Sequence, residues 1–158
     1  MRYLVFLVAI MLPMQAAALS CIRPSVERSY AEVAAAKETY VVAKGRLTFD
    51  QRKLPPDDNG PVKPPKLTRI EARLVGSSLS SNGFNVPFDQ PVTLEVACYG
   101  PWCGSAKSGG QVLAFLKRSK RGYALDINPC GGRSFADPKA KMLKQVVQCH
   151  KGGHCKAK

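Results

Sequence analysis

Residues 70–98 read IEARLVGSSLSSNGFNVPFDQPVTLEVAC, and this stretch decides the fold. Apolar and polar residues alternate over residues 70–74 and again over 92–98, which predicts two half-buried strands. After the polar stretch 77–81, the dipeptide Asn82-Gly83 supplies the positive backbone angles of a tight hairpin. The sequence therefore predicts a β-hairpin built from these two strands.

Three more strands and two helices are predicted on either side of this hairpin. Alternation with a period of two predicts a strand over residues 40–50, and two further strands are predicted over residues 112–116 and 123–128, joined by the basic turn 118–122. Apolar positions three and four apart predict a first helix over residues 25–37. Asp137 is expected to cap a second helix, with Pro138 in its first turn and an apolar stripe of Met142, Leu143, Val146 and Val147.

The number of strands limits the choice of architecture. Five strands are enough to close a small barrel, whereas an immunoglobulin-like sandwich needs seven. The predicted fold is therefore mainly β, an OB-like five-stranded β-barrel with an N-terminal and a C-terminal helix, stapled by disulfides. Residues 51–66, with five prolines, predict a long surface loop. We expect a signal peptide at 1–18, one barrel domain with its C-terminal helix at 19–148 and a basic Cys/His tail at 149–158.

The first 18 residues have the pattern of an export signal. Arg2 precedes the apolar run 3–14, and Ala16, Ala17 and Ala18 supply small residues for cleavage. Cleavage after Ala18 and cleavage after Ser20 both satisfy the small-residue rule. Lipidation of Cys21 is less expected, because Leu19 stands one position too late for a lipobox. The chain is thus expected to be periplasmic or secreted, where its six cysteines should pair.

Charge and histidine content favour a binding protein over an enzyme. The chain has a net charge of +13, and removing Arg2 leaves 23 basic against 11 acidic side chains, or +12. Such an excess favours acidic partners. The only histidines, His150 and His154, lie in the tail, so the predicted barrel has no imidazole base. Glu71, Glu95 and Asp126 fall on the outward phase of their strands, where a solvated charge is the ordinary role. No catalytic residue and no cofactor are predicted.

Two short segments are candidate binding sites. Lys117, Arg118, Lys120 and Arg121 form a basic hairpin (residues 117–121) between two predicted strands, a candidate site for a polyanion. Nucleic acid is a less expected partner than an anionic envelope polymer or a membrane surface, because the chain is exported and its strands offer few outward aromatics for base stacking. Tyr99 and Trp102 either form an exposed recognition loop or pack on a neighbouring disulfide.

The tail carries a cluster of metal-type side chains. Cys149, His150, His154 and Cys155 lie within seven residues and could surround zinc or copper. An oxidising compartment favours a local disulfide instead, which leaves His150 and His154 as weak metal ligands. No metal site is therefore predicted.

Six short motifs follow one another between residues 19 and 136: Leu19-Ser20-Cys21, Pro24-Ser25-Val26-Glu27, residues 41–46, Cys103-Gly104, residues 110–116 and Cys130-Gly131. Their order and rough spacing resemble the netrin-like module of tissue inhibitors of metalloproteinases and its bacterial relatives. Members of that family fold as a five-stranded barrel of the OB type. The resemblance therefore implies the same fold that the strand pattern predicts.

The resemblance also implies how the cysteines pair. Family members begin with Cys-x-Cys, and Leu19-Ser20-Cys21 corresponds to that triplet with leucine in place of the first cysteine. The usual mate of that missing cysteine corresponds to Cys103, which is therefore expected to pair with the nearby Cys98. The implied set of disulfides is Cys21 with Cys130, Cys98 with Cys103 and Cys149 with Cys155.

Two functions follow from these patterns. The first is an exported basic binding module that holds an anionic polymer or membrane surface. The alternative, implied by the resemblance, is a metalloprotease-inhibitor-like protein that acts on a protease through Leu19, Ser20 and Cys21. In the family the first residue chelates the protease zinc and a disulfide holds it rigid. This chain is not expected to form that disulfide, because Leu19 stands where the family has its first cysteine.

Overall fold

The computed structural model describes residues 19–56, 63–153 and 155. The predicted signal peptide and His154 lie outside the described residues. Within the described part of the chain, no helix is long and apolar enough to cross a membrane.

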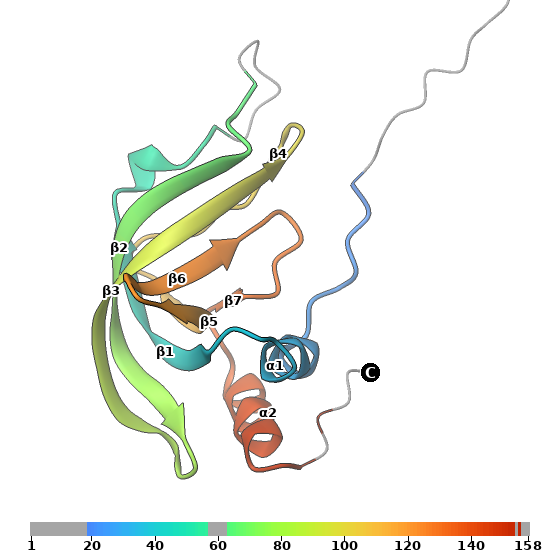
Figure 1. Cartoon of the computed structure of the whole chain (residues 1–158), viewed down its shortest axis with the longest axis vertical. Coiled ribbons are helices and arrows are strands. Elements are labelled where there is room, and N and C mark those ends of the chain that lie inside the picture. Colours follow the sequence, from blue (N-terminus) through green and yellow to red (C-terminus); the bar gives the residue numbers. More distant parts are fainter. Residues whose placement is uncertain (1–18, 57–62, 154, 156–158) are drawn as a thin grey trace, which may run out of the picture.

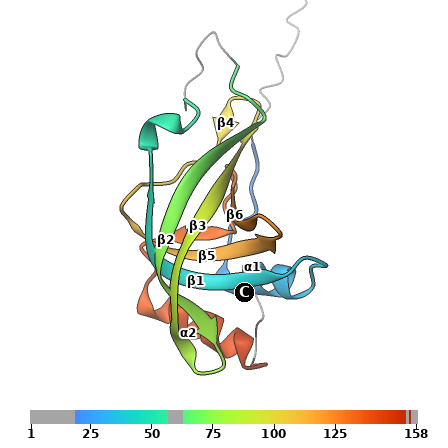
Figure 2. The ribbon, with the colours of Figure 1, turned by 60° about the vertical axis from the view of Figure 1, so that its left-hand side comes forward.

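Five strands pair in a closed ring. They are β1 (Tyr40–Phe49), β2 (Leu67–Ser80), β3 (Gly83–Tyr99), β5 (Gln111–Ser119) and β6 (Gly122–Ile127). The order around the ring is β1-β2-β3-β6-β5, and β5 pairs with β1 to close it (Figure 1, Figure 2). All these pairs are antiparallel except β3 with β6. The strands do not follow one another around the ring in chain order, because β6 lies between β3 and β5.

The five predicted strands are present, but the central hairpin is longer than expected. Residues 77–80 continue β2 instead of forming a loop, and β3 begins directly after the turn at Gly83. The polar residues of this stretch are held by pairing on both sides, with Ser78 opposite Ala43 of β1 and Val86 of β3. Pairing to two neighbours therefore overrides the weak strand propensity of serine.

The interior of the ring is the main hydrophobic core. Alternate residues of β5 face inward, and Leu47, Leu74, Leu94 and Leu125 from the other strands are completely buried beside them. The intervening residues of β5, Leu113 and Phe115, are equally buried on the outer face. Strand β5 is thus covered on both sides, which explains its continuous apolar run.

The outer face of β1 and β5 is covered by α1 (Val26–Ala34) and α2 (Ala140–His150), which lie side by side (Figure 1). Ser25 caps α1, and its side chain accepts a hydrogen bond from the N–H of Arg28 at 3.2 Å. Helix α1 ends three residues earlier than predicted, at Ala34. The prediction that Asp137 caps α2 is wrong. The N–H of Asp137 donates to the main-chain oxygen of Gln111 instead, and the cap position falls on Lys139. The predicted place of Pro138 in the first turn is also wrong, because Pro138 precedes the helix.

Three short elements lie outside the predicted strands and helices. A 3-10 turn, η1 (Gln51–Lys53), opens the proline-rich loop and is capped by Asp50. Hydrogen bonds from Arg52 lower the pKa of Asp50. Strand β4 (Trp102–Cys103) pairs with the end of β3, and β7 (Ser134–Ala136) pairs with β5. These elements order the loops at one end of the ring.

Three disulfides join the six cysteines: Cys21 to Cys130, Cys98 to Cys103 and Cys149 to Cys155. These are the pairs implied by the family resemblance. Cys149 belongs to α2 rather than to a separate tail, so the bond to Cys155 folds the chain back onto the end of the helix. Three disulfides indicate an oxidising, extracytoplasmic location.

Candidate functional site

The loops at one end of the ring enclose a cleft of about 530 Å³, here called the loop cleft. One wall is the loop 103–110 and the other is the segment 127–137, with the buried side chains of Leu47 and Val112 between them. Cys103 and Cys130 both line the cleft. Two of the three disulfides therefore fix the backbone around it.

The loop 103–110 is held to β1 by side-chain hydrogen bonds. The hydroxyl of Ser108 donates to the main-chain oxygen of Phe49 at 2.7 Å and accepts from its N–H at 2.9 Å. The Gln51 side chain accepts from the N–H of Ser108 at 2.7 Å and donates to the carbonyl of Ala106 at 2.9 Å. This wall of the loop cleft is thus formed before any ligand arrives.

The predicted N-terminal site residues lie in an extended segment next to the loop cleft. Ser20 and Cys21 are exposed, Leu19 is half-buried, and the following Ile22 is 74% exposed. The bond from Cys21 to Cys130 ties this segment to a wall of the cleft. The structure thus places the N-terminal triplet beside loops that lie far from it in sequence.

Residues 99–102 form an exposed turn, here called the aromatic turn. Cys98 and Cys103 stand opposite each other at the base of the turn and are joined by a disulfide. Beyond them, Tyr99 pairs with Trp102, and these side chains are 47% and 39% exposed. The structure therefore supports a solvent-facing aromatic pair on a braced hairpin, one of the two alternatives that the sequence left open.

No protein-family model, curated protein or solved structure matches this chain. What the protein does must therefore be read from its own side chains. Beside the loop cleft and the aromatic turn, the sequence singles out the basic hairpin, the Cys/His tail and three strand carboxylates.

The basic hairpin forms the turn between β5 and β6. The hydroxyl of Ser119 accepts from the N–H of Arg121 and donates to the main-chain oxygen of Gly122, each at 3.2 Å, which fixes the turn. Arg118, Lys120 and Arg121 are exposed. Lys117 does not join them. It is half-buried within β5 and lines a small cleft with Glu95 and Asp126.

Within the described residues, the three exposed cations of the basic hairpin have no ion pair, as is also true of Arg23, Arg28 and Arg46, whereas four other arginines have one. Arg52, Arg69, Arg73 and Arg133 each lie within 3.1 Å of a carboxylate oxygen. Within residues 19–56, 63–153 and 155, no carboxylate lies within 4.0 Å of the charged groups of Arg118, Lys120 or Arg121. The tip of the hairpin therefore presents three charges that the described chain does not neutralise.

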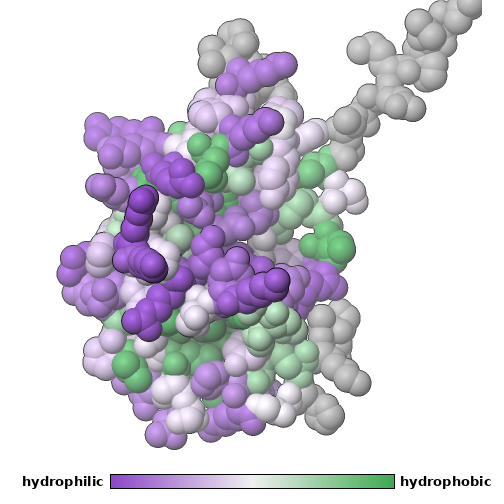
Figure 3. Space-filling view, in the orientation of Figure 1, coloured by the Kyte–Doolittle hydropathy of each residue, from purple (hydrophilic) through white to green (hydrophobic). Residues whose placement is uncertain are grey.

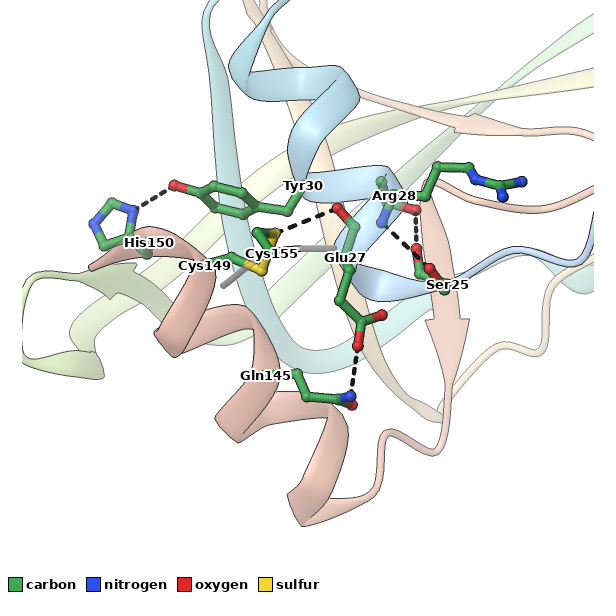
Figure 4. The surroundings of a disulfide bond; sticks show 9 residues. Ser25, Glu27, Arg28, Tyr30, Gln145, Cys149, His150 and Cys155 are labelled. Atoms are coloured by element: carbon green, nitrogen blue, oxygen red, sulfur yellow. Dashed lines mark hydrogen bonds between the residues drawn. A yellow bond between two sulfur atoms is a disulfide. The ribbon is translucent and has the colours of Figure 1, made fainter. Parts of the chain in front are cut away.

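The Cys/His tail is closed by its disulfide (Figure 4). Sγ of Cys155 lies 3.4 Å from the main-chain oxygen of Glu27, so the tail packs against α1. Nδ1 of His150 lies 2.9 Å from the hydroxyl of Tyr30, whose pKa is raised by burial. In the described part of the chain, no three metal-type side chains gather, and both thiols of the cluster are oxidised.

The three strand carboxylates do not converge on the loop cleft. Glu71 and Asp126 are exposed, and Glu95 forms an ion pair with Arg69 at 3.1 Å. Glu95 and Asp126 are neighbours across β3 and β6 on the outer face of the ring. Their positions agree with the outward phase that the strand pattern predicts.

Proposed function

We propose that this chain is an exported, non-catalytic binding module that holds an anionic component of the cell envelope on its basic hairpin. The five-strand ring serves as the rigid support, and we assign it to the OB type of barrel. On the motifs between residues 19 and 136, we assign the chain to the netrin-like family. The observation that carries the proposal is the set of three exposed, unneutralised cations at the tip of a fixed turn.

The chemistry of such a site is electrostatic. Like charges on adjacent residues repel one another, and an anionic partner relieves that repulsion. Arginine adds planar groups of donors that fit phosphate or sulfate oxygens in pairs. Because hydrogen bonds of Ser119 already fix the turn, little backbone entropy is lost on binding.

Replacing Arg118, Lys120 and Arg121 with glutamine should weaken binding to dextran sulfate by about 100-fold at low salt. Each exposed cation at an anionic surface contributes about 1 kcal/mol, and three together give a factor of that size. The melting temperature should change little, because none of the three forms an ion pair in the described chain. Isothermal titration calorimetry and thermal unfolding measure the two quantities.

The matched control removes the same charge elsewhere. Lys139, Lys141 and Lys144 are exposed at the start of α2, and their replacement by glutamine also lowers the net charge by three. This control should lose much less affinity than the hairpin variant. Equal losses would mean that net charge alone drives binding, and the basic hairpin would then be only a solvated turn.

A second candidate function is inhibition of a metalloprotease by the N-terminal segment. It is favoured by the bond from Cys21 to Cys130, which holds an exposed, extended segment beside the loop cleft. In that case the chain beginning at Leu19 should inhibit a zinc protease, and acetylation of its amine should abolish inhibition. Inhibition should also persist at high salt, unlike binding at the basic hairpin. Absence of inhibition by the free-amine form would exclude this candidate.

A further inference from the structure

The aromatic turn has a composition suited to the boundary between water and lipid. Tyr99 and Trp102 are amphipathic, with an apolar ring and one polar group, and both side chains project at the tip of a hairpin. Leu67, which pairs with Ala97 on the neighbouring strand, is 42% exposed. Three large side chains thus stand in solvent at one end of the ring, where β4 lies in Figure 1.

The segments that carry these side chains are basic. Residues 63–70 and 96–110 contain Lys63, Lys66, Arg69 and Lys107 and no acidic residue. The N–H of Cys98 donates to the main-chain oxygen of Lys66 at 3.0 Å, and Leu67 pairs with Ala97, so the two segments are held together. The glutamate that neutralises Arg69 comes from outside them, at Glu95 of β3.

The small apolar area of Tyr99, Trp102 and Leu67 decides which kind of partner these side chains fit. A stable protein interface buries about 800 Å² on each partner, far more than three side chains provide. In Figure 3, hydrophobic side chains are interspersed with hydrophilic ones on the face that is shown. A bilayer needs no matching surface, because a few aromatic and aliphatic side chains with flanking cations bind at an anionic interface.

We infer that the aromatic turn, together with Leu67, inserts into the interfacial region of an anionic bilayer. The disulfide between Cys98 and Cys103 keeps the two rings projecting, so the turn enters the lipid without refolding. The inference rests on the proposed function, since it takes the anionic envelope component to be a lipid surface. It adds a second contact, at the loop end of the ring, to the basic hairpin.

Trp102 is the single tryptophan of the chain, so its fluorescence reports directly on the aromatic turn. The full exported protein is mixed with vesicles of phosphatidylglycerol and phosphatidylethanolamine, with phosphatidylcholine vesicles, or with soluble dextran sulfate. Only the phosphatidylglycerol vesicles should shift the emission to the blue, and bromine atoms on their acyl chains should quench it. Dextran sulfate should bind the basic hairpin with no blue shift.

Two variants test whether insertion contributes to affinity. Replacing both Tyr99 and Leu67 with serine should weaken vesicle binding in sedimentation by about tenfold, because their apolar surface no longer enters the lipid. Val86→Ser is the matched control: this β3 side chain is 47% exposed, as Tyr99 is, but lies at the other end of the strand. The control should bind as the natural chain does.

The outcomes separate the inference from the proposed function. Vesicle binding without a blue shift, or equal loss in the Val86 control, would overturn insertion and leave the proposed function standing. Binding to dextran sulfate but not to vesicles would likewise overturn insertion and leave the proposed function standing. Failure to bind either ligand at low salt would overturn both.

Discussion

Replacing Cys21 and Cys130 with alanine should lower the free energy of unfolding by about 2 to 5 kcal/mol. The bond closes a loop with a sequence separation of 109 residues, so it removes more entropy from the unfolded chain than either of the other two disulfides. It also ties the exposed N-terminal segment, which precedes α1, to the loop that follows β6. Urea denaturation of the oxidised variants measures the loss.

Removal of the Cys98–Cys103 bond is the control for this prediction. Its sequence separation is only 5, and loop-closure entropy makes the long-range bond worth about 2 to 3 kcal/mol more. A double alanine variant at Cys98 and Cys103 should therefore be clearly more stable than the variant at Cys21 and Cys130. Equal destabilisation would show that the N-terminal bond contributes no more than a local staple.

Gly45→Ala should destabilise the protein by about 3 kcal/mol, as overpacking of a dense interior does. Gly45 of β1 faces Gly76 of β2, and a Cβ on Gly45 would lie 2.3 Å from the main-chain oxygen of Val75. Main-chain atoms cannot rotate away as a flexible side chain can. The two strands would have to separate where β1 also pairs with β5, so the ring itself would be strained.

Gly110→Ala is the matched control for the strand glycine. A Cβ at this position would meet its nearest atom, the main-chain oxygen of Lys107, at 3.5 Å, which is an ordinary contact. Its stability should change by less than about 1 kcal/mol. If thermal unfolding shows the same loss of stability for both variants, the close approach of β1 and β2 is not the reason that position 45 needs glycine.

Periodicity in the sequence predicts which residues form strands better than it predicts how the strands connect. The pattern of apolar residues predicts all five strands of the ring, as alternation where one face is buried and as a continuous run in β5, which is covered on both faces. It cannot show that β6 pairs in parallel with β3, because the partner of a strand depends on long-range closure. The full lengths of β2 and β3 are not predicted for a related reason. Their polar halves show no apolar alternation and are stabilised by pairing with neighbouring strands.

The candidate site is predictable only where its residues are neighbours in sequence. Four cations within five residues identify the basic hairpin, but alternation along β5 turns Lys117 away from the tip and towards Glu95 and Asp126. The loop cleft combines segments around Leu47, Cys103 and Cys130, so no local motif marks it. The lack of acidic residues in 63–70 and 96–110 is visible in the sequence, yet only the pairing of β2 with β3 makes them one surface.

The salt dependence of binding tests most directly whether the basic hairpin is a polyanion site. Binding of dextran sulfate is measured over a range of salt concentrations for the natural chain, the hairpin variant and the α2 control. Each contact with an anionic group releases counterions, so removing three cations should reduce the slope of log K against log salt by about 2 to 3. The α2 control should keep the slope of the natural chain. Parallel lines for the natural chain and the hairpin variant would contradict the proposal.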